Sequence, residues 1–145
     1  MNSTRTCWDT AINLLTRREH SRTELTQKLK LRDFGSEEIE KTLYELEKLG
    51  LQSNARFAGS YMRMRRDKGF GPIKIKYELM EKGIDKDLID EIVDENSEEW
   101  LECVKKTYHK KFGKTTPQDF QEKNKQINFL AYKGFSFEQI KKVFD

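Results

Sequence analysis

Apolar side chains recur every three or four residues along most of the chain, which is the spacing of one face of an α-helix. One such stretch carries Ile39, Leu43, Leu46 and Leu49, and Gly50 stands where this helix should end. Almost every segment shows this helical spacing rather than the strict alternation that is typical of a half-buried strand. The pattern therefore predicts an all-α fold.

Start and stop signals divide the chain into nine short helices. Ser21 and Ser136 open two of them with capping boxes, in which the serine and a Glu or Gln three residues later satisfy each other's backbone donors. Pro72 occupies a first helical position, where its missing N–H is harmless, and Thr116-Pro117 predicts the start of the eighth helix. The glycines expected to end helices are Gly50, Gly69, Gly83, Gly113 and Gly134.

The same three-helix pattern occurs three times, at an interval of about 50 residues. The equivalent apolar positions are Leu29, Leu79 and Leu130; Phe34, Ile84 and Phe135; Ile39, Ile89 and Ile140; and Leu43, Val93 and Phe144. Asp33 in the first copy stands where the other copies have Gly83 and Gly134. The sequence therefore predicts three tandem three-helix repeats. They span residues 1–52, 53–94 and 95–145.

The composition indicates how these repeats should be arranged. Of the 145 residues, only 35% are hydrophobic and 37% are charged, whereas about a quarter is usual for charged residues. Each repeat has few core-sized side chains, and a core of this size supplies only about 3–5 kcal/mol. We therefore expect the repeats to pack on one another in an elongated, curved molecule. Such shapes present long surfaces for other macromolecules and few enclosed pockets.

Several functional classes are disfavoured by the sequence. No apolar stretch is long enough for a transmembrane helix or a signal peptide, so we expect a cytoplasmic protein with no membrane contact. Cys7 and Cys103 lie outside any Cys-x-x-Cys pattern and are interpreted as structural thiols. His20 lies in a polar turn beside Ser21, and no carboxylate near His109 in the sequence is placed to orient it. The turn at 69–72 lacks the ending of a phosphate-binding loop. We therefore expect no enzymatic activity, no catalytic residues, no metal and no cofactor.

Positive charge is concentrated locally, although the net charge is only +3. Six basic residues and one acid lie between positions 63 and 76, five lysines and no acid lie between 105 and 114, and Arg17 and Arg18 form a smaller cluster. If these faces align, they form a basic stripe able to follow a phosphate backbone or an acidic protein groove. Solvated faces balanced by acids elsewhere are the alternative. Phe70 can stack on a base, but plugging a helix junction is our preferred interpretation.

Specific motifs accompany these patterns over nearly the whole chain. Residues 57–84 combine an aromatic-Ala start, several arginines, a Lys-Gly-aromatic-Gly-Pro turn and a closing Lys-Gly-Ile. The first repeat has Ser-Arg-Thr-Glu-Leu at 21–25, and the third has Phe-Leu-Ala-Tyr-Lys-Gly-Phe at 129–135. Together these motifs resemble the RecX family. The chain departs from the family pattern at Asp33, where a glycine is expected, and at Ile73, where a basic residue is common.

The resemblance implies a regulator of the RecA recombinase. Such a protein would lodge in the groove of RecA–single-stranded-DNA filaments, oppose filament growth, strand exchange and ATP hydrolysis, and so modulate DNA repair, recombination and the SOS response. We expect a monomer that binds RecA, with weak direct binding to single- or double-stranded DNA. The candidate filament contacts are Arg17, Arg18, Arg63, Arg65, Arg66, Lys68 and Lys74, followed by Lys105, Lys106, Lys110 and Lys111.

Two other functions remain open at this point. Residues 21–51 resemble half of a winged-helix domain, so a helix-turn-helix DNA-binding protein is the alternative. Against it, residues 54–66 have a helical pattern where a wing needs strands, and the second helix is acidic. A protein adaptor indifferent to nucleic acid is the third possibility. A DNA-binding protein should lose affinity for DNA as the salt concentration rises, because each phosphate contact releases counterions. An adaptor should show no DNA binding.

Overall fold

The computed structural model describes residues 5–114 and 116–145. Within these residues the chain forms nine α-helices and no strand, which confirms the all-α class. The helices are α1 (Cys7–Arg17), α2 (Arg22–Leu31), α3 (Ser36–Lys48), α4 (Asn54–Asp67), α5 (Pro72–Glu81), α6 (Lys86–Ile92), α7 (Glu99–Phe112), α8 (Phe120–Tyr132) and α9 (Phe137–Phe144).

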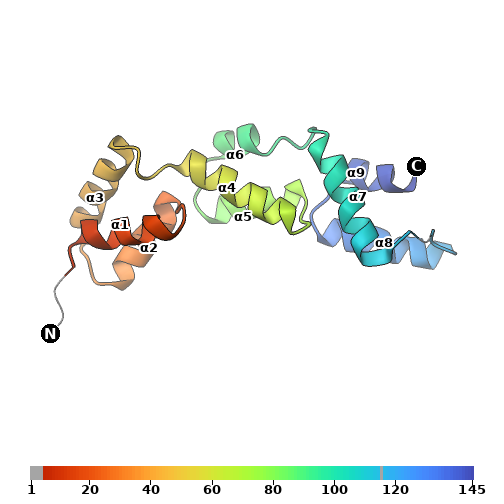
Figure 1. Ribbon diagram of the computed structural model, residues 1–145, viewed down its shortest axis with the longest axis horizontal. Helices are drawn as coiled ribbons and strands as arrows, with labels where there is room; N and C mark the ends of the chain where they lie inside the picture. The colour runs from red at the N-terminus through yellow and green to blue at the C-terminus, as the bar shows by residue number, and fades with distance from the viewer. Residues whose placement is uncertain (1–4, 115) are drawn as a thin grey trace.

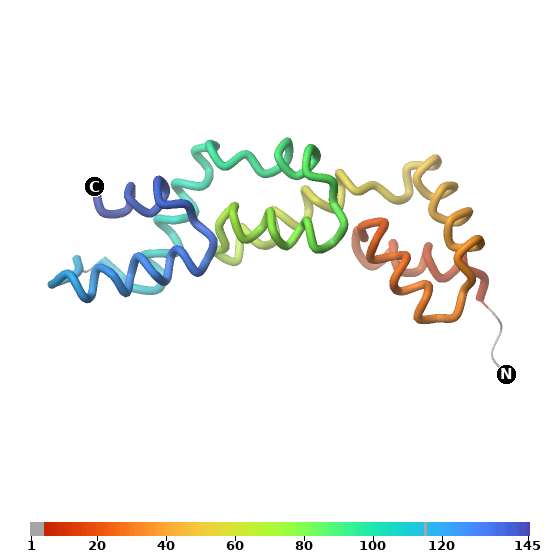
Figure 2. The backbone as a smooth tube through the Cα atoms, turned by 180° about the vertical axis from the view of Figure 1, so that it is seen from behind, coloured from red at the N-terminus to blue at the C-terminus, as the bar shows by residue number. Residues whose placement is uncertain are grey.

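The helices are arranged as three units in a row (Figure 1). The closely packed helix pairs belong to the same unit: α1–α3, α4–α6 or α7–α9. The two chain ends lie at opposite ends of the molecule, and the row is gently bowed, with the middle unit above the end units in Figure 1. Figure 2 shows the same order from behind. The predicted elongated, curved array of three-helix repeats is confirmed, and 1–52, 53–94 and 95–145 remain our proposed limits for the units.

Local side-chain chemistry explains where most helices begin. The Ser21 hydroxyl accepts a hydrogen bond from the Glu24 N–H at 3.0 Å, and the Glu24 carboxylate accepts one from the Ser21 N–H at 3.1 Å. Ser136 and Gln139 form the same reciprocal pair at the start of α9. Pro72 lies at the start of α5, as predicted. The capping signals read from the sequence are therefore confirmed at these helices.

The predicted start of the eighth helix at Thr116-Pro117 was wrong. The helix begins at Phe120, and Asp119 is its N-cap. The Asp119 carboxylate accepts a hydrogen bond from the Glu122 N–H at 2.8 Å, so a short acidic side chain satisfies the donor that a helix start leaves free. A proline fits a first helical turn, but it does not require one to form.

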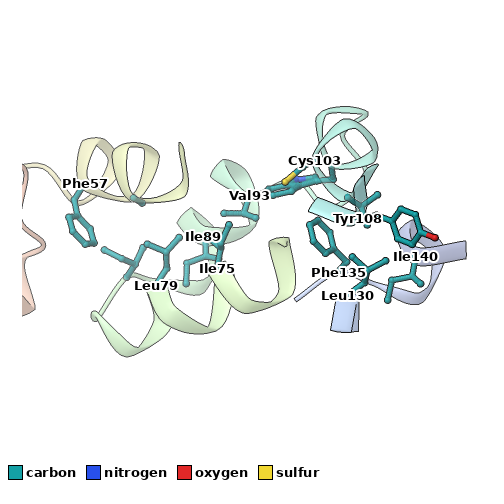
Figure 3. Packing of buried hydrophobic residues seen from close by; sticks show 14 residues of the cluster. Phe57, Ile75, Leu79, Ile89, Val93, Cys103, Tyr108, Leu130, Phe135 and Ile140 are labelled. Carbon is teal, nitrogen blue, oxygen red and sulfur yellow. The ribbon is translucent and has the colours of Figure 1, made fainter. Parts of the chain in front are cut away.

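The three units do not share one core evenly. The first unit has its own cluster of buried apolar residues, with Leu25, Leu29 and Leu43 fully buried. The second and third units share a single cluster, which runs from Phe57 to Ile140 (Figure 3). The expectation that neighbouring units pack through apolar surface therefore applies to the second joint. The contacts across the first joint are largely polar.

The end of the middle helix in one unit rests on the middle helix of the unit before it. Gly83 has φ +81, and a Cβ there would overlap the side chain of Thr23 in the first unit. Gly134 has φ +101, and a Cβ there would overlap the Cβ of Lys74 in the second unit. The equivalent Asp33 also has positive φ, at 66°, but it is exposed rather than packed against a neighbouring unit in the described residues. Asp tolerates this left-handed conformation better than most residues, so only the later copies require glycine.

The joint between the second and third units is also a backbone contact. The Gly71 N–H donates to the Lys133 carbonyl at 2.8 Å, and the Ile73 N–H donates to the Gly134 carbonyl at 3.0 Å. A Cβ at Gly71 would lie 2.5 Å from the Gly134 carbonyl carbon. Rigid backbone therefore lies where a side chain at position 71 would point.

We predict that Gly71→Ala lowers the free energy of unfolding by about 1–3 kcal/mol, the usual effect of overpacking. Gly35→Ala is the matched control, because Gly35 is also an N-cap with negative φ, but a Cβ there would have no atom within 4 Å. Its effect should stay within about 0.5 kcal/mol. Urea unfolding of both variants measures the difference, and equal effects would contradict the tight joint.

Candidate functional site

The candidate basic residues occupy two separate regions. Arg17 and Arg18 lie at the end of α1 in the first unit. The residues from α4, α5 and α7 gather around the second joint, which we define as the contact of α4 and α5 with α7 and α8. The structure therefore brings together two sequence clusters that are about 40 residues apart, and it leaves the first cluster apart from them.

Arg65 is held inside the middle unit by an acid. Its Nε donates to Glu78 Oε1 at 2.9 Å, and its Nη2 donates to Glu78 Oε2 at 2.8 Å. The exposed fractions of the two side chains are only 18% and 17%. The Tyr61 hydroxyl donates to the same carboxylate at 2.9 Å. Arg65 therefore serves to join α4 to α5, and its charge is largely satisfied within the fold.

The titration behaviour of this group follows from the same contacts. Burial works to raise the pKa of Glu78, but the hydrogen bonds from Arg65 and Tyr61 outweigh it and lower that pKa. The bond to Glu78 raises the pKa of Arg65. Burial, together with the bond to Glu78, raises the pKa of Tyr61 to about 12. All three groups therefore keep their ordinary charge state at neutral pH.

Phe70 is half-buried at the second joint and packs against the shared core. The Arg65 guanidinium carbon and the Lys133 Nζ each lie 3.8 Å from its ring centroid. Cations at this distance over a ring are attracted to its π-electrons. Since two cations already cover the ring, stacking on a base would require one of them to move. The arrangement favours the plug interpretation of Phe70.

Two residues of this site, Tyr132 and Lys133, were absent from the candidate set. Lys74 Nζ lies 4.5 Å from the Tyr132 ring, which is 73% exposed, and 5.5 Å from the Phe70 ring. Burial lowers the pKa of Lys133, and the charges of Arg65, Lys74 and Lys110 lower it further. Comparing the three repeats in the sequence could have indicated Lys133. A basic residue precedes the left-handed position in every copy, as Arg32, Lys82 and Lys133.

A groove of about 510 Å³ lies between the end of α4 and α7. Lys68, Lys106 and Lys110 line it, so candidates from both sequence clusters meet there. Its charge is mixed, because Asp67, Glu99 and Glu102 line it as well. The Arg66 Nη1 lies 2.6 Å from a Glu99 carboxylate oxygen, and this ion pair ties α4 to α7. The alternative of basic residues balanced by acids therefore applies to part of this surface.

The remaining candidates lie on the outer surface. Arg63 on α4 and Lys105 on α7 are exposed. Lys111 is exposed too, and its Nζ lies 5.4 Å from the Phe129 ring centroid. These side chains add exposed positive charge to the second and third units without being drawn into the internal pairs of Arg65 and Arg66.

In the first unit, Arg17 is exposed and Arg18 is paired. Arg18 makes a two-point contact with the Glu24 carboxylate, each N–O distance being 3.1 Å. Lys82 of the second unit reaches the same carboxylate at 3.6 Å. The first joint therefore balances its basic residues with an acid.

His20 is buried beside this group. Its Nδ1 lies 3.1 Å from the Arg18 carbonyl, and its Nε2 lies 2.9 Å from Lys28 Nζ. Because an ammonium group can only donate, Nε2 accepts and Nδ1 carries the proton. Burial lowers the pKa of His20, and the charges of Arg18 and Lys28 act in the same direction. His20 therefore belongs to the packing of the first joint.

Metal ligands and membrane-spanning segments are the other features that bear on the type of site. Among residues 5–114 and 116–145, no group of three or more His, Cys, Asp and Glu side chains is placed to hold a metal ion. No helix in this part of the chain is both long and apolar enough to cross a membrane. Cys7 and Cys103 are buried free thiols, and burial raises the pKa of each.

Family comparisons cover all three units. The models for the first, second and third three-helix domains of RecX match residues 7–46, 53–92 and 97–144. Regulatory protein RecX of Legionella pneumophila (strain Corby) is 42% identical over 137 residues, which are 94% of this chain and 91% of that protein. Regulatory protein RecX of Pseudomonas entomophila (strain L48) is 42% identical over 131 residues, covering 90% and 84% of the two chains.

A solved structure has the same fold. The crystal structure of RecX from Lactobacillus salivarius superposes with a TM-score of 0.79 at 24% identity, covering 95% of this chain and 92% of that one. The architecture and its basic second joint define a tandem-helical-repeat protein with an extended surface. The chain belongs to the RecX family, whose members in these comparisons are named regulatory proteins.

We predict that Arg65→Gln lowers the free energy of unfolding by about 1–3 kcal/mol, because Glu78 then loses its charged partner in a largely buried position. Lys68→Gln, at an exposed position that caps the same helix, should stay within about 0.5 kcal/mol. Denaturant unfolding compares the two. A stable Arg65→Gln protein would show that the Glu78 contact contributes little.

We predict that stability falls as the pH is lowered through about 6.5, the ordinary pKa of histidine. Because the folded-state pKa of His20 lies below that value, the unfolded chain binds more protons in this range, and acid favours unfolding. Thermal melting between about pH 7.5 and 5.5 measures the slope. His20→Gln should flatten it, whereas His109→Gln, at an exposed position, should not. Equal slopes in wild type and His20→Gln would contradict the assignment.

Proposed function

We propose that this protein binds RecA–single-stranded-DNA filaments and inhibits RecA's recombinase, strand-exchange and ATPase activities. The observation that carries the proposal is the match of all three units to RecX domains, together with close relatives named Regulatory protein RecX. The proposal includes a monomer without catalytic activity of its own, acting in the cytoplasm on DNA repair, recombination and the SOS response.

The shape of the molecule supports this role. Three units in an extended row offer a long surface, which suits a partner with a continuous groove (Figure 1). A filament groove is lined by protein and by a nucleic-acid strand, so a ligand for it needs apolar as well as basic contacts. Both kinds of surface occur on the middle unit. The basic part is the second joint described above.

The apolar part is a stripe on α5. Ile73, Tyr77 and Met80 follow one another at helix spacing and are 48%, 57% and 59% exposed. Ile75 and Leu79 on the opposite side of the helix are fully buried. The core is therefore formed by that side of α5, and the exposed stripe is not part of it. The equivalent positions are Thr23, Gln27 and Lys30 in α2 and Asn124, Asn128 and Ala131 in α8. We propose that this stripe contacts a RecA protomer.

The other functions have less support. A winged helix needs strands after its second helix, but residues 54–67 form helix α4, and α3 has Glu37 and Glu38 in its first turn. A pure adaptor would use the basic second joint only for an acidic protein groove, whereas a filament offers it both a protein and a nucleic-acid strand. Weak direct binding of single- or double-stranded DNA is part of the proposal, at the basic residues that remain exposed. Within the candidate set these are Arg17, Arg18, Arg63, Lys68, Lys105, Lys106, Lys110 and Lys111.

We predict that the wild-type protein lowers RecA's ATPase rate on single-stranded DNA at substoichiometric amounts. Replacing Tyr77 and Met80 by Ser should raise the half-inhibitory concentration about tenfold, or 1.4 kcal/mol, since exposed apolar anchors dominate such contacts. Replacing Leu31 and Tyr44 by Ser is the control, because these residues are at least as exposed but lie in the first unit.

Both double variants should keep the wild-type helix content, since neither removes a core residue. Equal inhibition by all three proteins would remove α5 from the proposed contact. If the wild type has no effect even at saturating amounts, the proposed function fails and the DNA-binding and adaptor functions return.

A further inference from the structure

The two joints of the molecule use equivalent residues with opposite charge. At the first joint, Lys82 lies 3.6 Å from the carboxylate of Glu24. In the repeat register, Lys82 corresponds to Lys133 and Glu24 corresponds to Lys74. The first joint therefore contains a cation–anion pair where the second contains two cations. Within the described residues, the second joint therefore lacks the close ion pair that Lys82 and Glu24 form at the first.

The surroundings of Lys133 do not supply the missing anion. Arg65, Lys74 and Lys110 all act on Lys133 with like charge. In the middle unit the charge of Glu78 acts on Lys74, but the two Glu78 oxygens already accept hydrogen bonds from Arg65 and Tyr61. Within residues 5–114 and 116–145, no carboxylate lies within 4.0 Å of the Lys74 or Lys133 ammonium group. An external anion would relieve this repulsion.

An exposed aromatic ring stands beside these cations. Tyr132 is 73% exposed, and Lys74 Nζ lies 4.5 Å from its ring centroid. Phe70 differs from it, because Phe70 is half-buried and already covered by Arg65 and Lys133. A largely exposed aromatic ring with a single lysine over it suits a nucleotide, whose base and phosphate require these two kinds of contact.

We propose that Lys74, Lys133 and Lys110 bind a backbone phosphate of single-stranded nucleic acid and that an adjacent base stacks on Tyr132. The inference rests on the proposed function, because the single strand in question is the one that a RecA filament contains. It adds the location of the strand contact within the second joint, which is formed by these lysines and Tyr132 rather than by the candidate arginines Arg65 and Arg66.

Fluorescence anisotropy with a labelled oligothymidylate and the full-length protein tests this site. Tyr132→Ala should weaken binding about fivefold or more, the usual range for one stacked base, and should have no effect on an abasic strand. Lys133→Gln should reduce the slope of log affinity against log salt by about 0.7. The matched controls are Tyr44→Ala, an exposed tyrosine of the first unit, and Lys82→Gln, the equivalent lysine of the first joint.

Thermal melting establishes that each variant is folded. Lys110→Gln repeats the salt test at the most exposed lysine of the proposed site. Binding by the Tyr132 and Lys133 variants that equals that of their controls would overturn the proposal. Weaker binding by the lysine variants with no effect of Tyr132→Ala would also overturn it, since the site would then bind a phosphate without stacking a base on Tyr132.

The outcomes separate this inference from the proposed function. If the wild type binds the oligonucleotide through Tyr132 and Lys133 but leaves RecA's ATPase unchanged, the strand site stands and the proposed function fails. If inhibition of RecA persists in the Tyr132 and Lys133 variants while their binding to free strand equals wild type, the proposed function stands and the strand site is wrong.

Discussion

The close backbone contact between Gly71 and Gly134 is the constraint on which the second half of the molecule depends. Because neither residue has a side chain, the Gly71 and Ile73 N–H groups reach the carbonyls of Lys133 and Gly134. This approach brings the cores of two units into one cluster. A small repeat that could not be comfortably stable alone thereby shares its buried surface with a neighbour.

The same contact determines the electrostatics of the surface. Lys133 supplies its carbonyl to the joint, and its side chain is therefore held over Phe70 and near Lys74. At the first joint, the corresponding lysine meets Glu24, which also binds Arg18. One architecture repeated along the chain thus produces a neutralised polar joint and a basic one. The difference comes from single side chains rather than from the fold.

Local chemistry explains which features could be predicted. Caps at Ser21 and Ser136 depend on residues three positions apart, so the sequence reveals them directly. The start of α8 was missed because two start signals, Thr116-Pro117 and Asp119, stand within four residues, and only the three-dimensional structure shows which one is used. Asp33 was an unexplained departure in the sequence. It becomes intelligible because Asp33 is exposed in the described structure, whereas a neighbour occupies the space at Gly83 and Gly134.

The sequence by itself determined the nine helices, the threefold repeat and the family, because these depend on periodicity, caps and motifs within short stretches. Only the tertiary structure decided which basic residues are available to bind a partner and which are engaged in ion pairs within the fold. Arg65 and Arg66 looked equivalent to Lys68, yet Glu78 and Glu99 bind them within the fold. Ion pairs join residues that are distant along the chain, and their energy depends on distance and burial, which neither composition nor spacing contains.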